Sequence, residues 1–468
     1  MRDPIQTRPA ATGKPLAIAP FVVVACLLFA ASAYARTLVV SSGVSTISIS
    51  QAVKVARDGD VVEVHAGIYN ENVVLDRSVE LAGIGKPVIR GLGQGSVVTV
   101  TANRCTVRGL IIEHSGGMLV HEDAGILLRS KNNRIERNEL RDVLFGIYLL
   151  QSDHNYIGGN SIRGRPLPDI GDRGSGIHIW NSTGNTLEGN TIFETRDGMY
   201  LQNANRSVIH GNRVHDLRYG LHYMYSDDNE FEGNLFYNNV AGAAIMYSRR
   251  IHFRHNVFAH NRGFASYGVL FQSDDDSIAE ENLIADNAVG IFTEALEHSV
   301  FRGNTLSGND LAFRVFSSST GNLFERNNIV DNLSPLEVIG SHTDNRWNGA
   351  TAGNYWSDYD GFDLDGNGVG DTPYKILNIF EHLEGGMPML RLYLFSPAAQ
   401  SLELAERGFP VFQREQETDR LPLVKPVART WAPPPAINGK PQHRTIALIV
   451  PAFLLVCTLR VFRSERPR

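Results

Sequence analysis

The chain has 468 residues, 43% of them hydrophobic and 9% aromatic, and a formal net charge of −6 at pH 7. That composition is typical of a folded globular protein and excludes an intrinsically disordered one. The slight negative charge argues against nucleic acid as a ligand, because nucleic-acid-binding domains present basic surfaces. With only three cysteines, the chain cannot be a disulfide scaffold.

Residues 1–35 have the pattern of an export signal. Basic residues precede an apolar run from Leu16 to Ala31, and Ala33-Tyr34-Ala35 forms a small-x-small cleavage site. We therefore expect residues 1–35 to be a signal peptide and the mature protein to work in the periplasm.

An asparagine recurs about every 22 residues through the middle of the chain, with two longer intervals, and a glycine keeps the same rhythm. The asparagines are Asn138, Asn160, Asn190, Asn212, Asn234, Asn256, Asn282 and Asn304, and the glycines are Gly146, Gly176, Gly198, Gly220, Gly242, Gly268 and Gly290. A fixed period of this size indicates a solenoid. Asparagine suits a turn because it tolerates left-handed backbone, and because stacked amides can bond along the axis.

Each repeat is predicted to consist of short strands. Apolar residues follow the glycines and precede the asparagines, and they alternate with polar residues, which is the signature of a strand with one buried face. No stretch between residues 60 and 345 has the 3.6-residue stripe that βα units need. The sequence therefore predicts an all-β, right-handed parallel β-helix over residues 36–350, with coils about 4.8 Å apart. A leucine-rich-repeat horseshoe is the alternative, but no leucine consensus is present.

Two further residue sets belong to this framework. Ser50 to Arg57 is predicted to form an N-terminal capping helix, because the open end of a solenoid needs covering. Cys105 stands in the same apolar column as Ile135 and Ile157, so a buried, inert thiol is favoured over a metal ligand or a disulfide partner.

One sheet is predicted to expose histidine and methionine side chains. Residues two and four positions after each ladder glycine should face outward if the flanking apolar residues face inward. His222 and Met224 then share one face of a strand, and Met246 lies one coil above Met224. Thioether and imidazole ligands together suit Cu(I), and His178, two coils from His222, is a weaker candidate ligand. The alternative is an apolar strip that binds a protein partner.

Carboxylates gather at one turn of the solenoid. Asp227, Asp228 and Asp274 to Asp276 fall in the same turn region, with Arg249 and Arg250 on the intervening coil. A carbohydrate-active lyase, hydrolase or epimerase acting on uronic-acid polysaccharide would need an acid and a base in a groove. Alternating charges more often mark a solvated edge, so we expect a protein that is not an enzyme and keep that enzyme as the alternative.

An Asp/Gly-rich loop after the repeats matches the first part of an EF-hand calcium loop. Its oxygen ligands would come from alternate positions, with Gly366 at position six, although Tyr374 replaces the usual glutamate at position twelve. A turn that needs no metal is the alternative. The candidate Ca²⁺ ligands are Asp363, Asp365, Asn367, Val369 and Asp371.

The C-terminal region is predicted to lead to the membrane. Residues 351–412 should form a C-terminal cap that includes a helix over Ser396 to Arg407, and residues 413–444 form a proline-rich, extended spacer. Residues 445–462 are apolar apart from Arg460, which suits a transmembrane or membrane-associated segment. The basic residues 463–468 would stay in the cytoplasm, so the body would be tethered to the inner membrane.

Three segments carry a resemblance to a known family. The stretches RYGLHYMYSDDN at 218–229, AIMYSR at 244–249 and GNYWSDY at 353–359 resemble the NosD family of periplasmic maturation factors for nitrous oxide reductase. That family belongs to a wider group of carbohydrate-binding and sugar-hydrolase β-helices, the CASH-domain proteins. The resemblance implies a scaffold that works with an ABC-type ATPase and its membrane permease subunit. It also implies that copper comes from a lipoprotein chaperone and goes to the copper centres of the reductase.

Overall fold

The computed structural model describes residues 35–43, 47–263, 265–340, 343–376, 396–398, 401 and 417–433. The chain divides into two compact units, Met1–Ala35 and Arg36–Arg468. The predicted signal peptide, the apolar segment 445–462 and most of the predicted helix at 396–407 lie outside the described residues. Within the described ranges, no helix has the length and apolar character needed to cross a membrane.

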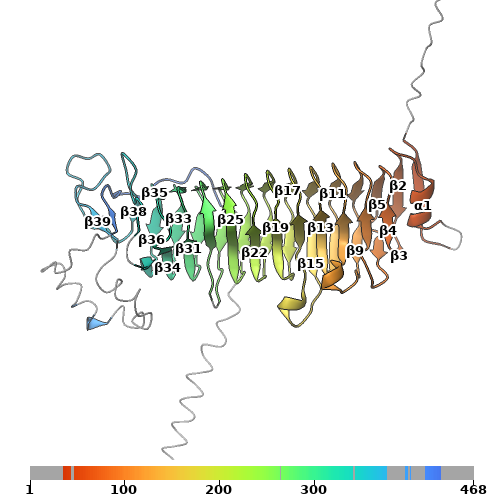
Figure 1. The fold of residues 1–468 in the computed structure, drawn as a ribbon, viewed down its shortest axis with the longest axis horizontal. Helices are drawn as coiled ribbons and strands as arrows, with labels where there is room; N and C mark the ends of the chain where they lie inside the picture. Colours follow the sequence, from red (N-terminus) through yellow and green to blue (C-terminus); the bar gives the residue numbers. More distant parts are fainter. Residues whose placement is uncertain are drawn as a thin grey trace, which may run out of the picture. The chain divides into compact units, whose positions relative to one another are not determined.

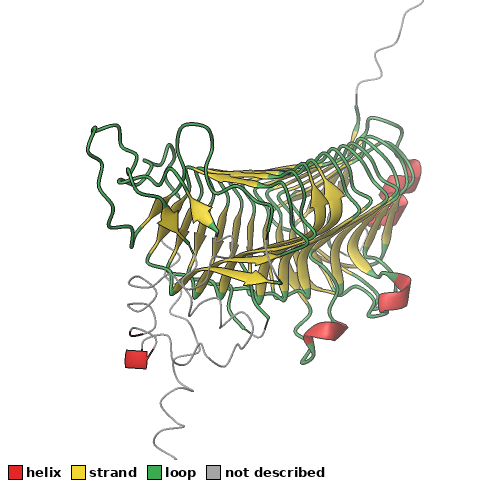
Figure 2. Ribbon diagram, turned by 60° about the vertical axis from the view of Figure 1, so that its left-hand side comes forward, coloured by secondary structure: helices red, strands yellow, loops and turns green. Residues whose placement is uncertain are grey.

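The second unit is built around a parallel β-helix, which confirms the predicted all-β solenoid (Figures 1 and 2). Each coil gives one strand to each of three parallel sheets, here called A, B and C. Sheet A has 13 strands, from β1 (Thr37–Val40) to β35 (Leu323–Glu325). Sheet B has 13, from β3 (Ile68–Asn70) to β38 (Tyr355–Trp356). Sheet C has 12, from β4 (Val73–Leu75) to β37 (Ser334–Ile339).

The inner strands of each sheet follow in chain order. Sheet A contains β2 (Val61–His65), β5 (Glu80–Ile84), β8 (Thr106–Arg108), β11 (Arg134–Glu136), β14 (Tyr156–Gly158), β17 (Thr186–Glu188), β20 (Val208–His210), β23 (Glu230–Glu232), β26 (His252–Arg254), β29 (Ile278–Glu280) and β32 (Val300–Arg302). Sheet B contains β6 (Val88–Arg90), β9 (Ile111–Glu113), β12 (Glu139–Val143), β15 (Ser161–Gly164), β18 (Thr191–Phe193), β21 (Arg213–His215), β24 (Leu235–Tyr237), β27 (Val257–Ala259), β30 (Leu283–Ala285), β33 (Thr305–Ser307) and β36 (Asn328–Val330). Sheet C contains β7 (Val98–Val100), β10 (Ala124–Leu128), β13 (Phe145–Leu150), β16 (Ile177–Trp180), β19 (Asp197–Gln202), β22 (Tyr219–Met224), β25 (Ala241–Arg249), β28 (Val269–Asp275), β31 (Val289–Glu294) and β34 (Leu311–Phe316).

A ladder of buried asparagine amides joins successive coils where sheet A passes into sheet B. The backbone N and the Nδ2 of Asn190 donate to Oδ1 of Asn212 at 2.9 and 3.0 Å, and those of Asn212 donate to Oδ1 of Asn234 at 3.1 and 2.9 Å. Asn160 makes the same pair of bonds to Asn190, so the predicted stacking is confirmed. The left-handed backbone, however, falls on the preceding residues, such as Gly211 at φ 65. Amide bonding along the axis is therefore the reason for asparagine.

The glycine column exists because the coils leave no room for a side chain there. A Cβ placed on Gly220 would lie 2.5 Å from the carbonyl oxygen of Gly242 on the next coil. The predicted apolar columns fill the interior, where Phe231 stacks on Phe253 with ring centroids 4.7 Å apart. The core is thus a set of like residues stacked along the axis.

Helix α1 (Ile49–Val55) forms at the position predicted for a capping helix. Ser48 and Gln51 close a capping box at its start. The carboxylate of Glu71 accepts the backbone N–H groups of Ile49 and Ser50, both at 2.9 Å. Cys105 is a buried free thiol, as predicted.

The described part of the predicted spacer does not extend away from the β-helix. Asp419, in β40 (Thr418–Asp419), is buried and pairs with β39 (Tyr374–Lys375). Its Oδ2 accepts the backbone N–H of Asn354 at 2.6 Å and the indole N–H of Trp356 at 3.0 Å. Because Asn354 is the last asparagine of the ladder, Asp419 ends the ladder with an acceptor.

The chain then runs back along the solenoid (Figure 1). The side-chain amide of Asn328 bonds both backbone polar groups of Val427 at 2.8 and 2.9 Å. Trp431 donates its indole N–H to the carbonyl of Glu281 at 2.7 Å and packs beside an apolar cluster on sheet B. Residues 434–444 of the predicted spacer lie outside the described residues.

We expect Asn234→Ala to lower the free energy of unfolding by about 3 to 5 kcal/mol, because several buried groups would lose partners at about 1 to 3 kcal/mol each. These groups are the N and Nδ2 of Asn212 and the Ile209 carbonyl, whereas Oδ1 of Asn256 loses one of its two donors from Asn234 and keeps the backbone N–H. Urea unfolding measures the change. Gln94→Ala, at an exposed loop position, should shift it by less than about 0.5 kcal/mol. Equal effects would show that the ladder does not hold the coils together.

Asp274 is not part of the acidic turn, so its predicted placement there is wrong. It is fully buried on β28, directly opposite Ser248. Burial raises the pKa of Asp274 to about 8, opposed by a hydrogen bond with Ser277 and aided by a smaller contribution from Asp275. The carboxyl group occupies the inward position that serine fills at Ser226 and Ser248 on earlier coils.

We expect Asp274→Ser to stabilise the protein increasingly as the pH rises. The folded protein keeps the proton up to a pKa of about 8, whereas an unfolded aspartate loses it near pH 3.9. The wild type should therefore lose up to about 1.4 kcal/mol of stability per pH unit between roughly pH 4 and pH 8. Thermal unfolding at pH 5 and pH 8 of wild type, Asp274→Ser and the partly exposed control Asp275→Ser measures the effect. A gain at pH 8 no larger than at pH 5 would contradict a buried neutral carboxyl.

Candidate functional site

Strands β16, β19, β22 and β25 arrange the predicted copper ligands in two columns. The first column has Cα partners His178, Tyr200, His222 and Ala244 on successive strands, and the second has Trp180, Gln202, Met224 and Met246. Met224 and Met246 therefore stand directly opposite each other, and His222 is two residues before Met224 on the same face. The structure brings these three side chains to one part of sheet C, as the sequence predicted.

His222 is held in place on one side of its ring. Its side chain is 17% exposed, and Nδ1 lies 3.4 Å from Oδ2 of Asp197. The ring of Tyr200 meets it edge-on at 4.9 Å, and the ring of Tyr219 is tilted against it at 5.1 Å. Nε2 has no hydrogen-bond partner among the described residues. One imidazole nitrogen is thus anchored and the other is available.

Asp197 is the residue that sequence reasoning missed. Its side chain is fully buried, and it accepts bonds from Nε and Nη2 of Arg218 at 2.9 and 2.8 Å. Burial alone would raise the pKa of Asp197, but the hydrogen bonds from His222 and Arg218 hold it below its usual range. A charged carboxylate behind a histidine fixes the ring and its tautomer, as carboxylates do behind metal-bound histidines. The one signal in the sequence is an aspartate immediately before ladder residue Gly198.

The prediction that the first column is exposed is wrong for His178, for Ala244 and for Tyr148, which continues this column on β13 opposite His178. Tyr148 is fully buried, His178 is 7% exposed and Ala244 is 1% exposed. Two inserted loops, which carry η1 (Leu119–His121) and η2 (Ile170–Asp172) and project from the solenoid, precede β10 and β16 in the chain (Figure 1). Tyr148 donates its hydroxyl to Glu122 in the first loop at 2.8 Å.

His178 is separated from His222. Its ring lies between those of Tyr148 and Tyr200, with each centroid 4.4 Å away, and both ring nitrogens are buried without a partner among the described residues. Burial lowers the pKa of His178 to about 3, so the ring is neutral. Because Tyr200 stacks on His178 and also touches His222, the two histidines do not share one metal position in this arrangement.

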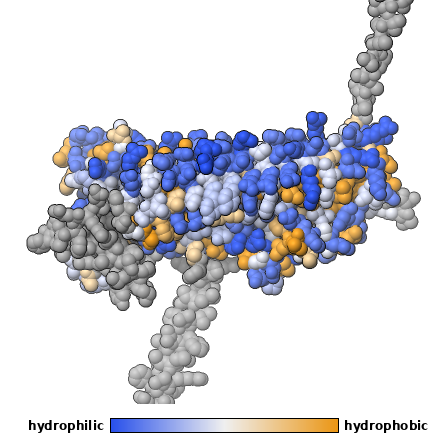
Figure 3. Space-filling view, in the orientation of Figure 1, coloured by the Kyte–Doolittle hydropathy of each residue, from blue (hydrophilic) through white to orange (hydrophobic). Residues whose placement is uncertain are grey.

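Exposed apolar side chains occur at the first inserted loop and directly after the two methionines. Met118, Leu119 and Val120 at the first loop are 53%, 39% and 79% exposed, and apolar colour gathers along the lower edge in Figure 3. Tyr225 and Tyr247, directly after Met224 and Met246, are 51% and 46% exposed and stack with centroids 5.1 Å apart. Their φ angles of 50 and 53° are unusual for bulky residues.

The calcium-like loop closes through its own hydrogen bonds. Oδ1 of Asp363 accepts the N–H groups of Gly366 and Asn367 at 2.8 and 3.1 Å, and Oδ2 accepts that of Gly368 at 2.9 Å. These backbone bonds, with that from Gly368 the largest influence, lower the pKa of Asp363. Across the described ranges, no three side chains of His, Cys, Asp or Glu are grouped so as to hold a metal ion. Convergence of the carboxylates on one cation would therefore require the loop to adjust.

The remaining predicted ligands of this loop are satisfied in the same way. Oδ2 of Asp371 accepts the N–H of Leu364 at 2.7 Å, Oδ2 of Asp365 accepts Nδ2 of Asn367 at 2.8 Å, and Oδ1 of Asn367 accepts the N–H of Val369 at 2.7 Å. Such turns stabilise a loop with or without a cation.

If the loop binds Ca²⁺, the chelator EGTA should lower the melting temperature of the wild type, because ligand binding to the native state adds stability. It should not lower that of a variant with Asp363→Ala and Asp365→Ala. Differential scanning fluorimetry with and without about 1 mM added Ca²⁺, a concentration in the range of weak calcium modules, compares the two proteins. Equal chelator sensitivity in both proteins would exclude a calcium site here.

The acidic turn is an ion-paired edge. Asp228 accepts Nε of Arg250 at 2.6 Å, and this bond lowers the pKa of Asp228. Oδ1 of Asp227 accepts the backbone N–H of Arg249 at 3.1 Å. Both acids are thus matched to arginines on the next coil, which agrees with the charge alternation seen in the sequence.

The fold and the three residues His222, Met224 and Met246 define a parallel β-helix protein with an anchored histidine beside two paired methionines on sheet C. The sequence model of a family described as "Periplasmic copper-binding protein (NosD)" matches residues 164–361, which include His222, Met224 and Met246. A Pseudomonas aeruginosa protein described as "Probable ABC transporter binding protein NosD" is 37% identical over 376 residues, covering 77% of this chain and 87% of that protein. A Stutzerimonas stutzeri protein of the same description is 33% identical, covering 77% of this chain and 86% of that protein. The chain belongs to the NosD family.

Solved structures confirm the architecture alone. The mannuronan C-5 epimerase AlgE6 A-module of Azotobacter vinelandii superimposes with a TM-score of 0.52 and 17% identity, covering 64% of this chain and 92% of that module. At this identity the likeness concerns the β-helix and carries no information on chemistry.

Proposed function

We propose that this protein is a periplasmic, non-catalytic scaffold that holds Cu(I) at His222, Met224 and Met246 while the copper centres of nitrous oxide reductase are assembled. The observation that carries the proposal is the register of sheet C, which sets Met224 opposite Met246 beside a histidine whose Nδ1 is anchored by a buried carboxylate. The family description as a periplasmic copper-binding protein supports it.

The ligand set suits a cargo ion that must be released again. Two thioethers and one imidazole are uncharged, soft ligands, which favour Cu(I) over the harder divalent ions. Asp197 would keep Nε2 of His222 directed toward the ion, and Arg218 balances the charge of Asp197. Because His222 remains 17% exposed, a partner could reach the ion without unfolding the coil. His178 would become a second ligand only if the rings of Tyr148 and Tyr200 that enclose it moved apart.

We propose that the exposed tyrosine pair is where the copper-exchanging partners dock. Tyr225 and Tyr247 flank the two methionines and offer a rigid aromatic surface, a composition typical of interface centres. The partners would be a lipoprotein copper chaperone as donor and the reductase as acceptor. The relatives' description as ABC transporter binding proteins supports an ABC-type ATPase and its membrane permease subunit as further partners. Attachment to the inner membrane through residues 445–462 stays a prediction.

Replacing His222, Met224 and Met246 together by Ala should weaken Cu(I) binding by at least about 100-fold, because all three soft ligands are lost. Competition with bicinchoninate under anaerobic conditions measures the affinity, and X-ray absorption identifies sulfur and nitrogen neighbours. The reductase made in cells with this variant should contain less copper. The melting temperature should stay close to that of the wild type, since these side chains lie outside the core.

Gln202→Ala with Gln272→Ala is the matched control, because it alters the same column without removing sulfur or imidazole. Full copper loading by the triple variant would refute the site and leave docking as the scaffold's contribution. A carbohydrate-active enzyme would instead turn over uronic-acid polymers and lose that activity on replacement of Asp227 and Asp228. The pairing of these acids with Arg249 and Arg250 speaks against that alternative.

A further inference from the structure

A column of rings runs along the outer face of sheet C and ends at His222. Tyr148, His178, Tyr200 and His222 are Cα partners on the successive strands β13, β16, β19 and β22. The ring of His178 stacks on Tyr148 and on Tyr200, with both centroids 4.4 Å away, and the ring of Tyr200 meets that of His222 edge-on at 4.9 Å. Rings this close attract one another, so the four form one continuous line of contacts.

The far end of this ring column is fixed by the first inserted loop. The hydroxyl of Tyr148 donates to Oε1 of Glu122, the residue that caps the end of η1, at 2.8 Å. Phe145 meets the rings of Tyr148 and His178 edge-on at 5.7 and 5.4 Å. Because Tyr148 and His178 are both buried, neither ring can turn without displacing its neighbours.

His178 contributes to the column through the faces of its ring. Both of its nitrogens are buried, and neither has a hydrogen-bond partner among the described residues. A buried polar group without a partner destabilises a protein. The contacts of His178 are therefore ones that a phenyl ring would also make.

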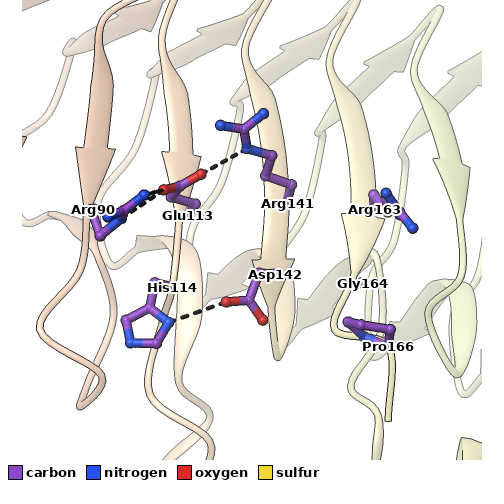
Figure 4. A pocket seen from close by; sticks show the side chains of 8 residues that line it. All are labelled: Arg90, Glu113, His114, Arg141, Asp142, Arg163, Gly164 and Pro166. Carbon is purple, nitrogen blue, oxygen red and sulfur yellow. Dashed lines mark hydrogen bonds and ion pairs between the residues drawn. The ribbon is translucent and has the colours of Figure 1, made fainter. Parts of the chain in front are cut away.

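A histidine on sheet B shows what a carboxylate does without such a column. Nδ1 of His114 lies 3.1 Å from Oδ2 of Asp142 (Figure 4), and Nδ1 of His222 lies 3.4 Å from Oδ2 of Asp197. The side chain of His114 is 52% exposed, whereas that of His222, against two tyrosine rings, is 17% exposed. The outer torsion of a histidine side chain has broad minima, so one bond at Nδ1 restrains the ring plane weakly and ring contacts have to fix it.

We propose that Tyr148, His178 and Tyr200 are positioning residues for His222, with Glu122 holding their far end. The inference rests on the proposed role of His222 as a Cu(I) ligand and adds the residues that prepare it. A ring whose plane is already fixed in the copper-free protein has less freedom to lose when the ion binds, which raises the affinity. The three rings act through His222 and do not touch the ion.

The first test measures the Cu(I) affinity of the purified full chain by anaerobic competition with bicinchoninate. His178→Leu breaks both stacking contacts and keeps an apolar side chain, and it should weaken Cu(I) binding about threefold to tenfold, the effect of losing an aromatic contact. His178→Phe keeps a flat ring and should stay within about twofold of the wild type. An equal loss in both variants would overturn the inference, because His178 would then act through its nitrogens.

Changes at Glu122 test whether the column acts over its whole length. Glu122→Ala removes the acceptor of the Tyr148 hydroxyl and should weaken Cu(I) binding at least about threefold. Glu122→Gln keeps an acceptor oxygen and should restore the wild-type affinity. Wild-type affinity in Glu122→Ala would show that the loop does not hold the column.

Tyr237→Leu is the matched control, because it disrupts a similar stack on sheet B. It should leave the Cu(I) affinity within about twofold of the wild type. Melting curves check that every variant is folded. The stack consists of Phe193, His215 and Tyr237, with centroids 5.4 and 4.7 Å apart.

The second test needs no copper and reads the ring signals of His222 by long-range proton–nitrogen NMR of histidine-labelled protein. His178→Leu and Glu122→Ala should shift these signals, because the ring of Tyr200 moves relative to His222, and Tyr237→Leu should not. Unchanged His222 signals in His178→Leu would overturn the positioning role. If Cu(I) binding by the wild type does not depend on His222, the proposed copper site is wrong, and the NMR comparison still decides whether the column positions this ring.

Discussion

Hydrogen bonds between buried asparagine amides on successive coils fix the register on which every other feature of this structure depends. Each ladder asparagine accepts from the backbone and the side chain of the one before it, so a coil cannot slide relative to its neighbour without breaking buried bonds. A slip of one residue would turn every side chain of a strand to the opposite face. The pairing of Met224 with Met246 follows from that fixed register.

The features that repeat with the coil could be predicted from the sequence, because each recurs often enough to show its period. The ladder asparagines, the glycines pressed against carbonyl groups and the inward apolar columns are of this kind. The relation of His222 to Met224 and Met246 follows from the same period. The features set by single insertions could not be predicted. His178 is buried between the rings of Tyr148 and Tyr200, and Glu122 of the first inserted loop bonds the hydroxyl of Tyr148, a contact that nothing near His178 in the sequence indicates.

Single residues that differ from the other members of their column could not be predicted from the sequence either. Asp274 takes an inward position used by serine on other coils, and Asp197 takes a position next to a glycine where tyrosine or alanine stands on the following coils. Each of these residues occurs only once in its column, so the repeat pattern gives no sign of it. The return of residues 417–433 along the solenoid depends on contacts between residues far apart in sequence, such as Asn328 with Val427, which leave no local signal.

The carboxylate of Asp419 has a consequence for how the last coil is completed. The final ladder residue, Asn354, has its N–H satisfied by a residue 65 positions further along the chain. Until that later segment arrives, the end of the solenoid presents an unpaired strand edge, which is a template for pairing with another chain. A chain is synthesised from its N-terminus onward, so the open edge would persist until residue 419 has been made. The returning segment thus acts as a stop that keeps one solenoid from continuing into the next.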